Sequence, residues 1–426
     1  MAALTAAAAV GQLAILQRGV HPLTFPDSRE YLALAAAGHG FGSFFDTKRT
    51  PGYPVFLGII ELAHGGPGTV VAVQVMVVLL TTAMAFVVAS RLGNPVVAAT
   101  AAAALVGANP WVTQWEQALL AEAPATLLLL LVAWSWIKLA ARPGLRRAAL
   151  VGALCALLVV VRPAFVPVAT ALAVAGLTFS VARRDRHLAL ATLVMLLAAY
   201  APVVGYVAGN ALGHGYAGIS TTSNVDVFGV AYLDFGLVPA AAPGPCAALA
   251  PLARSEHGED PYAFLGRHPK FASPGQAVLR DCGVMAIRAA PLAFLEHVAT
   301  RVVTLPFEGP VFYYDNPHVD TEPFKRPVAL FKVFHAWIVA SYVVVAGGLA
   351  VQLGRRSASL ATFGLVAAVA GQLVTVAALG PTELYRLRSP LDPLVTILAI
   401  TFCWTAFNAF PGKRVSVAPQ RQAEID

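Results

Sequence analysis

Long apolar runs, separated by short polar stretches, recur through most of the chain. Each run approaches the roughly 20 residues that an α-helix needs to cross the hydrocarbon core of a bilayer. We predict ten membrane-spanning helices, over approximately residues 2–17, 69–90, 95–109, 118–139, 147–161, 164–181, 188–210, 328–352, 358–379 and 390–408. The first run lacks the basic n-region of a signal peptide, so we interpret it as a retained span. The pattern predicts an all-α polytopic membrane protein.

Two polar segments interrupt this series. The first, about 18–68, contains "RTPGYPVFLGIIELAHG", whose apolar part is too short to span and is typical of an interfacial helix. The second is a long loop over 211–327. We therefore divide the chain into a transmembrane module over 1–210 with its first outer loop, the long loop over 211–327, the last three spans over 328–408 and a tail over 409–426.

Composition agrees with a membrane protein, because 58% of the residues are hydrophobic and only 12% are charged. The net charge of +7 comes mainly from basic residues in loops that ten spans place on one side of the bilayer. These are Arg91, Lys138, Arg142, Arg146, Arg147, Arg183, Arg184, Arg186, Arg355, Arg356, Lys413 and Arg414. The positive-inside rule makes that side cytoplasmic, with both termini inside and the segments 18–68 and 211–327 outside. No basic stretch is interleaved with aromatic residues, so nucleic acid is not an expected partner.

Two of the four cysteines, Cys246 and Cys282, lie in the long outer loop. An oxidising exterior permits a disulfide between them, and the sequence leaves open whether it forms. The sequence contains no CxxC pair and no Cys/His spacing typical of a metal site. We expect no firm cofactor, and a divalent metal is not favoured.

A cluster of charges in "TFPDSREYLALA", residues 24–35, follows directly after the first apolar run. One interpretation is a helix start, with Asp27 as N-cap and Glu30 completing a capping box. The other is a reactive carboxylate at the outer membrane surface, where Asp27 accepts a proton from a hydroxyl group. The two interpretations do not exclude each other.

The opening of the chain resembles that of GT-C glycosyltransferases, in particular the bacterial protein mannosyltransferase-like and aminoarabinose transferase-like branch. Asp27 is followed four residues later by Tyr31, and Arg49 precedes the Pro-Gly-Tyr-Pro stretch that contains Tyr53. These features are similar to the first outer loop of that family.

Three later stretches also resemble motifs of the family. "LLAEAPATLLLLL" places Glu122, "VVVRPAFVPV" places Arg162, and "LYRLRSPLDPLVTILAI" places Arg386 and Arg388. The long loop has no comparable match beyond "ISTTSNVDVFG". The resemblance therefore rests on the order of several short motifs along the chain.

The resemblance implies a GT-C-like fold in a multi-pass protein of the bacterial inner membrane. It implies transfer of a hexosyl or pentosyl group from a polyprenyl-phosphate donor to a hydroxyl of a glycan, lipid or protein acceptor. The reaction would be inverting and extracytoplasmic, with Asp27 as general base. The donor phosphate would be bound by Arg386, Arg388, Lys48 and Arg49, and the sugar or acceptor by Glu122, Tyr31, Arg162 and Tyr53. No metal is implied at this site, since the donor carries a monophosphate.

Simpler roles stay open for several of these residues. The two arginines before the last span could be snorkelling residues that only set topology. Glu122 could be a carboxylate favoured by a helix dipole, and Arg162 could anchor a turn.

Two other classes of protein remain as alternatives to a glycosyltransferase. One is a polytopic transporter or flippase, although the charged residues avoid the centres of the predicted spans. The other is an O-antigen ligase or polymerase of envelope glycans.

Overall fold

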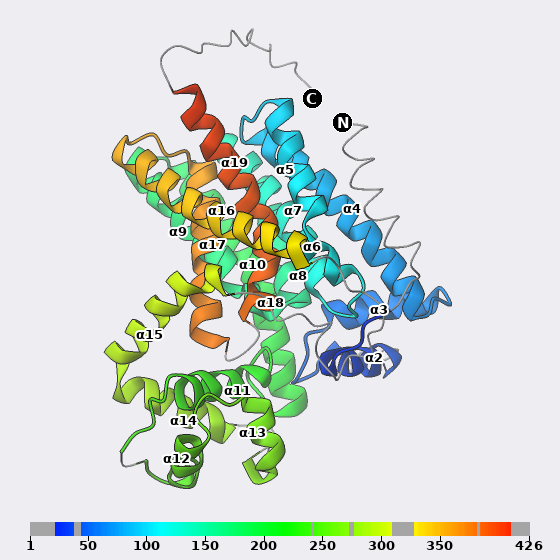
Figure 1. Ribbon diagram of the computed structural model, residues 1–426, viewed down its shortest axis with the longest axis vertical. Helices are drawn as coiled ribbons and strands as arrows, with labels where there is room; N and C mark the ends of the chain where they lie inside the picture. Colours follow the sequence, from blue (N-terminus) through cyan, green and yellow to red (C-terminus); the bar gives the residue numbers. More distant parts are fainter. Residues whose placement is uncertain are drawn as a thin grey trace.

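The computed structural model describes residues 22–37, 44–240, 242–271, 277–308, 328–380 and 384–409. Helices joined by turns make up these residues, and the only β pairing among them is an isolated bridge between Leu23 and Ala118. Figure 1 shows a bundle of long helices above a smaller group of short ones. The prediction of an all-α fold is confirmed.

The bundle contains a helix at nine of the ten predicted spans, and the tenth, 2–17, lies outside the described residues. The nine helices are α4 (Pro67–Arg91), α5 (Val96–Ala108), α7 (Glu122–Ala141), α8 (Leu145–Val161), α9 (Val166–Arg183), α10 (Arg186–His214), α16 (Val328–Gly354), α17 (Leu360–Leu379) and α19 (Asp392–Asn408). Seven helices among the described residues are long and apolar enough to cross a membrane. The chain is therefore a polytopic helical membrane protein. With 13 residues, α5 is shorter than a bilayer requires.

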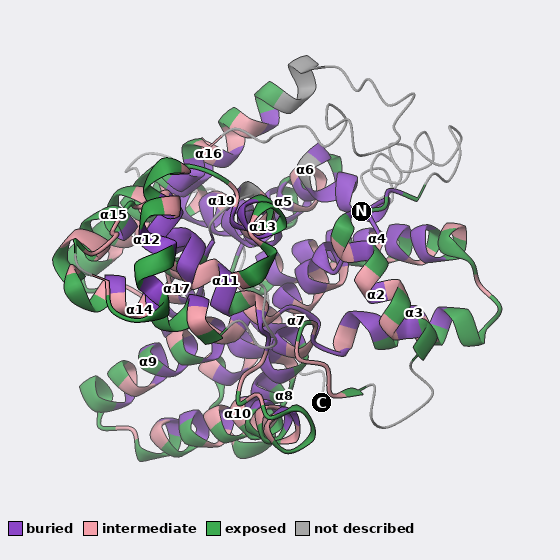
Figure 2. Ribbon diagram, turned by 90° about the horizontal axis from the view of Figure 1, so that it is seen from below, coloured by how far each residue is buried: buried purple, intermediate pink, exposed green. Residues whose placement is uncertain are grey.

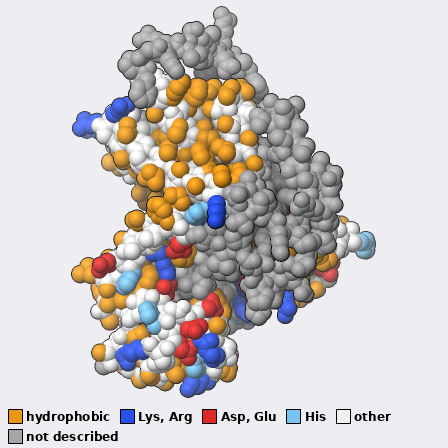
Figure 3. Space-filling view, in the orientation of Figure 1, with side chains coloured by type: hydrophobic (Ala, Val, Ile, Leu, Met, Phe, Trp, Pro, Cys, Tyr) orange, Lys and Arg blue, Asp and Glu red, His pale blue; other side chains and the backbone are white. Residues whose placement is uncertain are grey.

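Helices distant in sequence pack together inside the bundle. Helix α8 packs on α10, α17 packs on α9, and α19 packs on α16 and α5. Figure 2 shows that buried residues line the inward faces of these helices, while exposed and intermediate residues face outward. On the face seen in Figure 3, apolar side chains cover the bundle and charged side chains gather below it. An apolar outer surface of this kind suits contact with lipid.

The first polar segment folds into two short helices beside one end of the bundle (Figure 1). These are α2 (Pro26–Ala37) and α3 (Gly52–Leu62). They pack on each other through the rings of Tyr31 and Tyr53, whose centroids are 5.0 Å apart. Helix α3 has 11 residues, in agreement with the predicted interfacial helix that is too short to span.

The long polar segment folds into a separate unit with its own core, which we call the small module. It consists of α11 (Thr222–Phe228), a π-helical turn η4 (Gly229–Asp234), α12 (Pro245–Ser255), α13 (Pro261–Arg267) and α14 (Ala277–Ala289). Phe228, Leu249, Phe264 and Leu279 are fully buried in its core. The sequence showed a loop here because these helices are short and their apolar faces are narrow.

A disulfide joins α12 to α14 in the small module. Cys246 and Cys282, which the sequence left open as a pair, are bonded, with their Cα atoms 5.6 Å apart. Helix α15 (Pro291–Thr304) then leads back to the bundle, where Arg301 pairs with Asp234 and donates to the carbonyls of Ala377 and Gly380. The module is thus tied both internally and to the end of α17.

Loss of this disulfide is expected to destabilise the small module. The bond closes a loop with a sequence separation of 36 residues, for which loop entropy predicts a stabilisation of about 2–4 kcal/mol. The variant Cys282→Ser should therefore raise the rate of proteolysis within residues 222–289 while leaving cleavage of the bundle unchanged. Cys403→Ser, which removes a free cysteine, is the control. Equal proteolysis of both variants would show that the bond adds no stability.

Candidate functional site

The candidate site begins at Asp27, in the first turn of α2. The predicted N-cap role of Asp27 is wrong: Pro26 already begins the helix, and the hydroxyl of Ser28 accepts from the backbone N–H of Phe25 at 2.9 Å. The Asp27 carboxylate instead accepts from Nη2 of Arg49 at 2.6 Å and from Nη2 of Arg386 at 2.8 Å. One oxygen serves each arginine, so the carboxylate lies between two guanidinium groups.

Arg49 is held in place by the turn that precedes α3. Oδ1 of Asp46 accepts from the backbone N–H groups of Lys48 and Arg49, both at 2.7 Å. The phenol of Tyr206, on α10, donates to the carbonyl of Asp46 at 2.6 Å. Because the turn is anchored to a long bundle helix, the position of the Arg49 side chain is well defined.

Gly52 allows this turn to approach the bundle closely. A Cβ at this position would lie 2.7 Å from backbone atoms of Val160 and Val161, at the end of α8. No side chain fits at that distance, so the Gly in the Pro-Gly-Tyr-Pro stretch is required by packing. The close approach places the start of α3, three residues after Arg49, against the end of α8, which Arg162 follows.

Glu122 and Arg162 form a buried ion pair at 2.8 Å, with side chains only 1% and 9% exposed. Glu122 begins α7 and Arg162 follows α8, so both sit at the same end of the bundle as α2. The segment before α7 is fixed by Gln74 of α4, whose amide donates to the carbonyls of Glu116 and Ala118. Because this buried amide donates to two carbonyls, it holds the segment that leads into Glu122 in one position.

Pairing of Leu23 with the same segment aligns α2 with α7. Leu23 donates to the carbonyl of Gln117 at 2.8 Å and accepts from the N–H of Leu119 at 3.0 Å. This short pairing precedes Asp27 by four residues and Glu122 by three. It therefore explains why Asp27 and Glu122, which are far apart in sequence, both lie near Arg386.

Arg386 joins the two halves of the site. It lies on α18 (Leu384–Arg388), just before the last bundle helix. Its Nε donates to Oε1 of Glu122 at 2.5 Å, and its Nη2 donates to Asp27. A planar guanidinium can serve two carboxylates at once because its donors point in fixed directions.

Together these contacts make one continuous chain of alternating charges, which we call the ion-pair chain. In order, it runs through Lys48, Glu30, Arg49, Asp27, Arg386, Glu122 and Arg162. It contains four basic and three acidic side chains, so it carries one excess positive charge. Exposure changes along it, from 52% for the Lys48 side chain to 25% for Asp27 and 1% for Glu122. One end is therefore open to a ligand and the other is sealed.

The arginines lower the pKa of Asp27. Burial alone would raise the pKa of this carboxyl, but the charges of Arg386 and Arg49, and the hydrogen bonds from both, outweigh burial and hold the pKa below its usual value. Asp27 is therefore an anion at neutral pH, with both oxygens occupied by guanidinium groups. In this state it is a weak base.

The two predicted tyrosines form an aromatic wall beside Arg49. The guanidinium of Arg49 lies over the Tyr31 ring, 5.3 Å from its centroid, a contact that favours a cation near an aromatic face. Tyr53 is fully buried and donates its hydroxyl to Oε1 of Gln74 at 2.9 Å. Through this hydrogen bond Tyr53 connects α3 to α4.

Arg388 is not part of the ion-pair chain. It is 3% exposed, donates to the carbonyl of Leu305 at 2.6 Å and lies 3.5 Å from Asp392. Because α18 is a helix, residues two positions apart point to different sides. Arg386 therefore reaches Asp27, while Arg388 packs toward α19.

Sequence reasoning missed two groups that the structure brings to the site. Glu30, assigned there only to a capping box, pairs with Lys48 and with Nε of Arg49 at 2.6 Å. Asp226 lies on α11, and the segment leading into α11 bonds to the turn that carries Arg49, through the N–H of Thr221 and the carbonyl of Thr47. Its signal was a single carboxylate within the apolar stretch "NVDVFGV".

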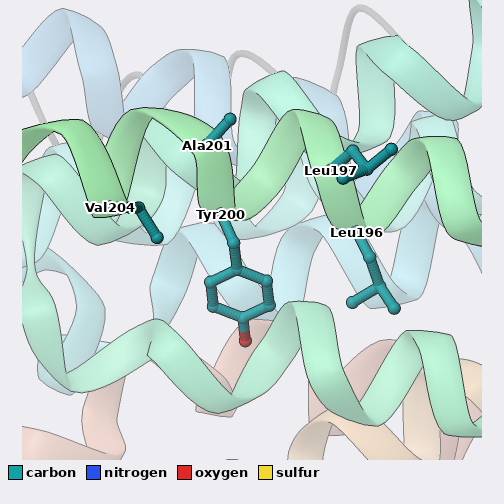
Figure 4. Close-up of a pocket in the computed structure, with 5 residues that line it drawn as sticks. All are labelled: Leu196, Leu197, Tyr200, Ala201 and Val204. Carbon is teal, nitrogen blue, oxygen red and sulfur yellow. The ribbon is translucent and has the colours of Figure 1, made fainter.

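Other candidate sites are weaker. Among the described residues, no group of three His, Cys, Asp or Glu side chains is arranged to hold a metal ion. A shallow apolar groove runs along α10, lined by Leu196, Leu197, Tyr200, Ala201 and Val204 (Figure 4). It contains no charged side chain, so it differs in character from the ion-pair chain.

Comparison with known proteins gives little further information. No family model and no curated protein sequence matches the chain. Among solved structures, it is similar to ArnT from Cupriavidus metallidurans bound to undecaprenyl phosphate. The two sequences are 14% identical, the match covers 92% of this chain and 77% of that one, and the TM-score is 0.36. A similarity this low assigns neither a family nor an activity.

Proposed function

We propose that the protein is a membrane glycosyltransferase that moves a sugar from a polyprenyl-phosphate donor to an acceptor hydroxyl on the extracytoplasmic side. The observation that carries the proposal is a carboxylate, Asp27, held between two arginines at the open part of the ion-pair chain. A base next to a site for an anion is what such a transfer needs. The motif resemblance described above supports the same reaction.

The donor phosphate is proposed to bind Arg49 and Arg386. Both guanidinium groups are partly exposed, with side chains 17% and 13% accessible. Guanidinium is suited to phosphate because it offers paired donors and stays charged. The ion-pair chain has one excess positive charge, so the negative charge of a lipid phosphate would complement it. Lys48, at the exposed end, would add a further cation.

Phosphate binding is also proposed to activate Asp27. When the phosphate draws the two arginines toward itself, their hold on the carboxylate weakens and the pKa of Asp27 rises toward its usual value. Asp27 then takes the proton of the acceptor hydroxyl while that oxygen bonds to C1 of the sugar. The bond between C1 and the phosphate oxygen breaks, its electron pair leaves with the phosphate, and the configuration at C1 inverts.

The position of the charges supports a transferase over a transporter. Glu122 begins α7, Arg162 follows α8, and Arg386 precedes α19, so these buried charges lie at helix ends. Ion-coupled transporters usually place ionisable groups near the middle of the membrane. The ion-pair chain instead suits a headgroup at the membrane surface.

Binding of undecaprenyl phosphate tests the proposed donor site. Purified protein in nanodiscs should bind this lipid, as measured by native mass spectrometry. The variant Arg49→Gln should bind it roughly 10- to 100-fold more weakly, because charge-assisted hydrogen bonds to the phosphate are lost.

Arg267→Gln is the matched control for this experiment. Arg267 also pairs with two carboxylates, Glu256 and Glu259, but it lies on the surface of the small module. Its replacement should leave lipid binding unchanged. The proposal is refuted when the wild-type protein does not bind the lipid, or when both variants bind it as the wild type does.

A further inference from the structure

Asp226 and Tyr262 form a polar pair on the small module. The hydroxyl of Tyr262, in the first turn of α13, donates to Oδ1 of Asp226 on α11 at 3.0 Å. Asp226 is half-buried, and Tyr262 is 45% exposed. The pair is therefore partly accessible to solvent.

The small module places this pair next to the ion-pair chain. The N–H of Thr221 donates to the carbonyl of Thr47 at 2.6 Å, and the hydroxyl of Ser220 donates to that of Lys48 at 2.6 Å. The segment leading into α11 is thus bonded to the turn that carries Arg49. In both Figure 1 and Figure 2, α11 and α13 are the module helices nearest to α2.

The pair lies within electrostatic reach of the ion-pair chain. The charges of Arg49 and Asp27 act on the carboxyl of Asp226 and on the phenol of Tyr262. Burial raises the pKa of Asp226 to about 7, with opposing effects from Tyr262 and Arg49 and small further increases from Asp27 and Asp260. Such a pKa is typical of a carboxyl that lacks a cationic partner.

Asp226 differs from the carboxylates of the ion-pair chain in exactly this respect. Asp27, Glu30 and Glu122 each pair with at least one arginine. Across the described ranges, no Lys, Arg or His lies within ion-pair distance of Asp226, and its second oxygen accepts no hydrogen bond from a described residue. A half-buried carboxyl oxygen that accepts no hydrogen bond from a described residue is open to solvent or to a ligand.

We propose that Asp226 and Tyr262 form a subsite that binds the hydroxyl groups of a sugar ring opposite Asp27. Tyr262 uses its O–H on Asp226, so the pair presents the free oxygen of the carboxyl and the lone pair of the phenol. When Asp226 is ionised both are acceptors, and they suit neighbouring hydroxyls of one sugar. This inference rests on the proposed function, because it names the group that the same site would hold.

The surrounding charge favours hydroxyl groups over an amine. The one excess positive charge of the ion-pair chain balances the negative charge of an ionised Asp226. The site as a whole therefore has no net negative charge that would favour an ammonium ligand over a neutral hydroxyl. The chemistry therefore indicates a neutral sugar.

Titration with soluble glycosides tests the subsite. Methyl mannopyranoside, methyl glucopyranoside and methyl arabinofuranoside are added to the full-length protein in nanodiscs, and binding is measured by saturation-transfer NMR. At least one glycoside should bind the wild-type protein. The variants Asp226→Ala and Tyr262→Phe should each bind it about tenfold more weakly or worse, since each removes an acceptor or its orientation.

Asp281→Ala is the matched control, because Asp281 is an exposed carboxylate of the same module that pairs only with its neighbour Arg280 among the described residues. Tyr262→Phe removes one hydroxyl from a partly exposed ring, so it keeps the test valid where Asp226→Ala folds poorly. Methyl glucosaminide is added in the same way as an amine probe. The inference is overturned if no glycoside binds, if both variants bind like the control, or if this amine probe alone binds.

A competition experiment distinguishes the two sources of a sugar. Undecaprenyl phosphate mannose is added to protein already saturated with the glycoside. Displacement assigns the subsite to the sugar of the donor, and continued binding assigns it to the acceptor. Glycoside binding without any binding of undecaprenyl phosphate would keep the subsite and refute the proposed donor site, so the two proposals fail separately.

Discussion

The variant Asp27→Asn is expected to fold normally and to lose sugar transfer by about 10²- to 10⁴-fold, the usual contribution of a general base. Asparagine matches the carboxylate in shape but cannot take a proton. The fold should survive because each neighbouring arginine keeps another carboxylate, Glu30 for Arg49 and Glu122 for Arg386. Turnover of a polyprenyl-phosphate sugar by protein in nanodiscs measures the loss, and thermal unfolding measures the fold.

Two further measurements separate catalysis from binding. Asp27→Asn should bind undecaprenyl phosphate at least as tightly as the wild type, because it removes an anion that competes with the phosphate for the two arginines. Asp281→Asn, a change of the same kind on the surface of the small module, should keep full turnover. A fully active Asp27→Asn protein would mean that Asp27 only orients the arginines. Loss of both turnover and lipid binding would also contradict a role as base.

The bundle could be predicted from sequence because apolar length alone decides a membrane span. Nine predicted spans coincide with helices, within a few residues at most ends. The small module could not be predicted in this way. Its helices α11 and α13 have only seven residues each, and they are stabilised by contacts with one another and by the Cys246–Cys282 bond. No local pattern records such contacts.

The sequence predicted most residues of the candidate site but not which of them contact one another. Asp27 and Arg386 are separated by 359 positions, so only the fold shows that they touch. The sequence assigns both Arg386 and Arg388 to the donor phosphate. Their segment is a helix, α18, so the two side chains diverge, and Arg386 joins the ion-pair chain whereas Arg388 packs toward α19. Glu122 and Arg162, expected to contact sugar or acceptor, form an ion pair with each other in the least exposed part of the site.

The second large expected effect is a loss of stability when the buried ion pair of Glu122 and Arg162 is broken. Replacing Glu122 with glutamine is expected to destabilise the protein by about 3–5 kcal/mol, because it leaves the buried Arg162 without a counter-charge. The Arg162 side chain is 9% exposed, so water cannot replace the lost partner. The midpoint of thermal unfolding in detergent should fall strongly. Glu256→Gln, which breaks an ion pair on the surface of the small module, should lower it little, since water screens an exposed pair.

A double variant identifies the cause of this loss. Glu122→Leu combined with Arg162→Leu removes both charges, and well-packed apolar residues often replace a buried ion pair at little cost. Arg386 would still hold Asp27. We expect the double variant to recover most of the stability lost in Glu122→Gln but to bind undecaprenyl phosphate more weakly, because Arg386 has lost the carboxylate that fixes its Nε. Unchanged stability in Glu122→Gln would show that the pair is not needed for the fold. Unchanged lipid binding in the double variant would show that Glu122 does not position Arg386.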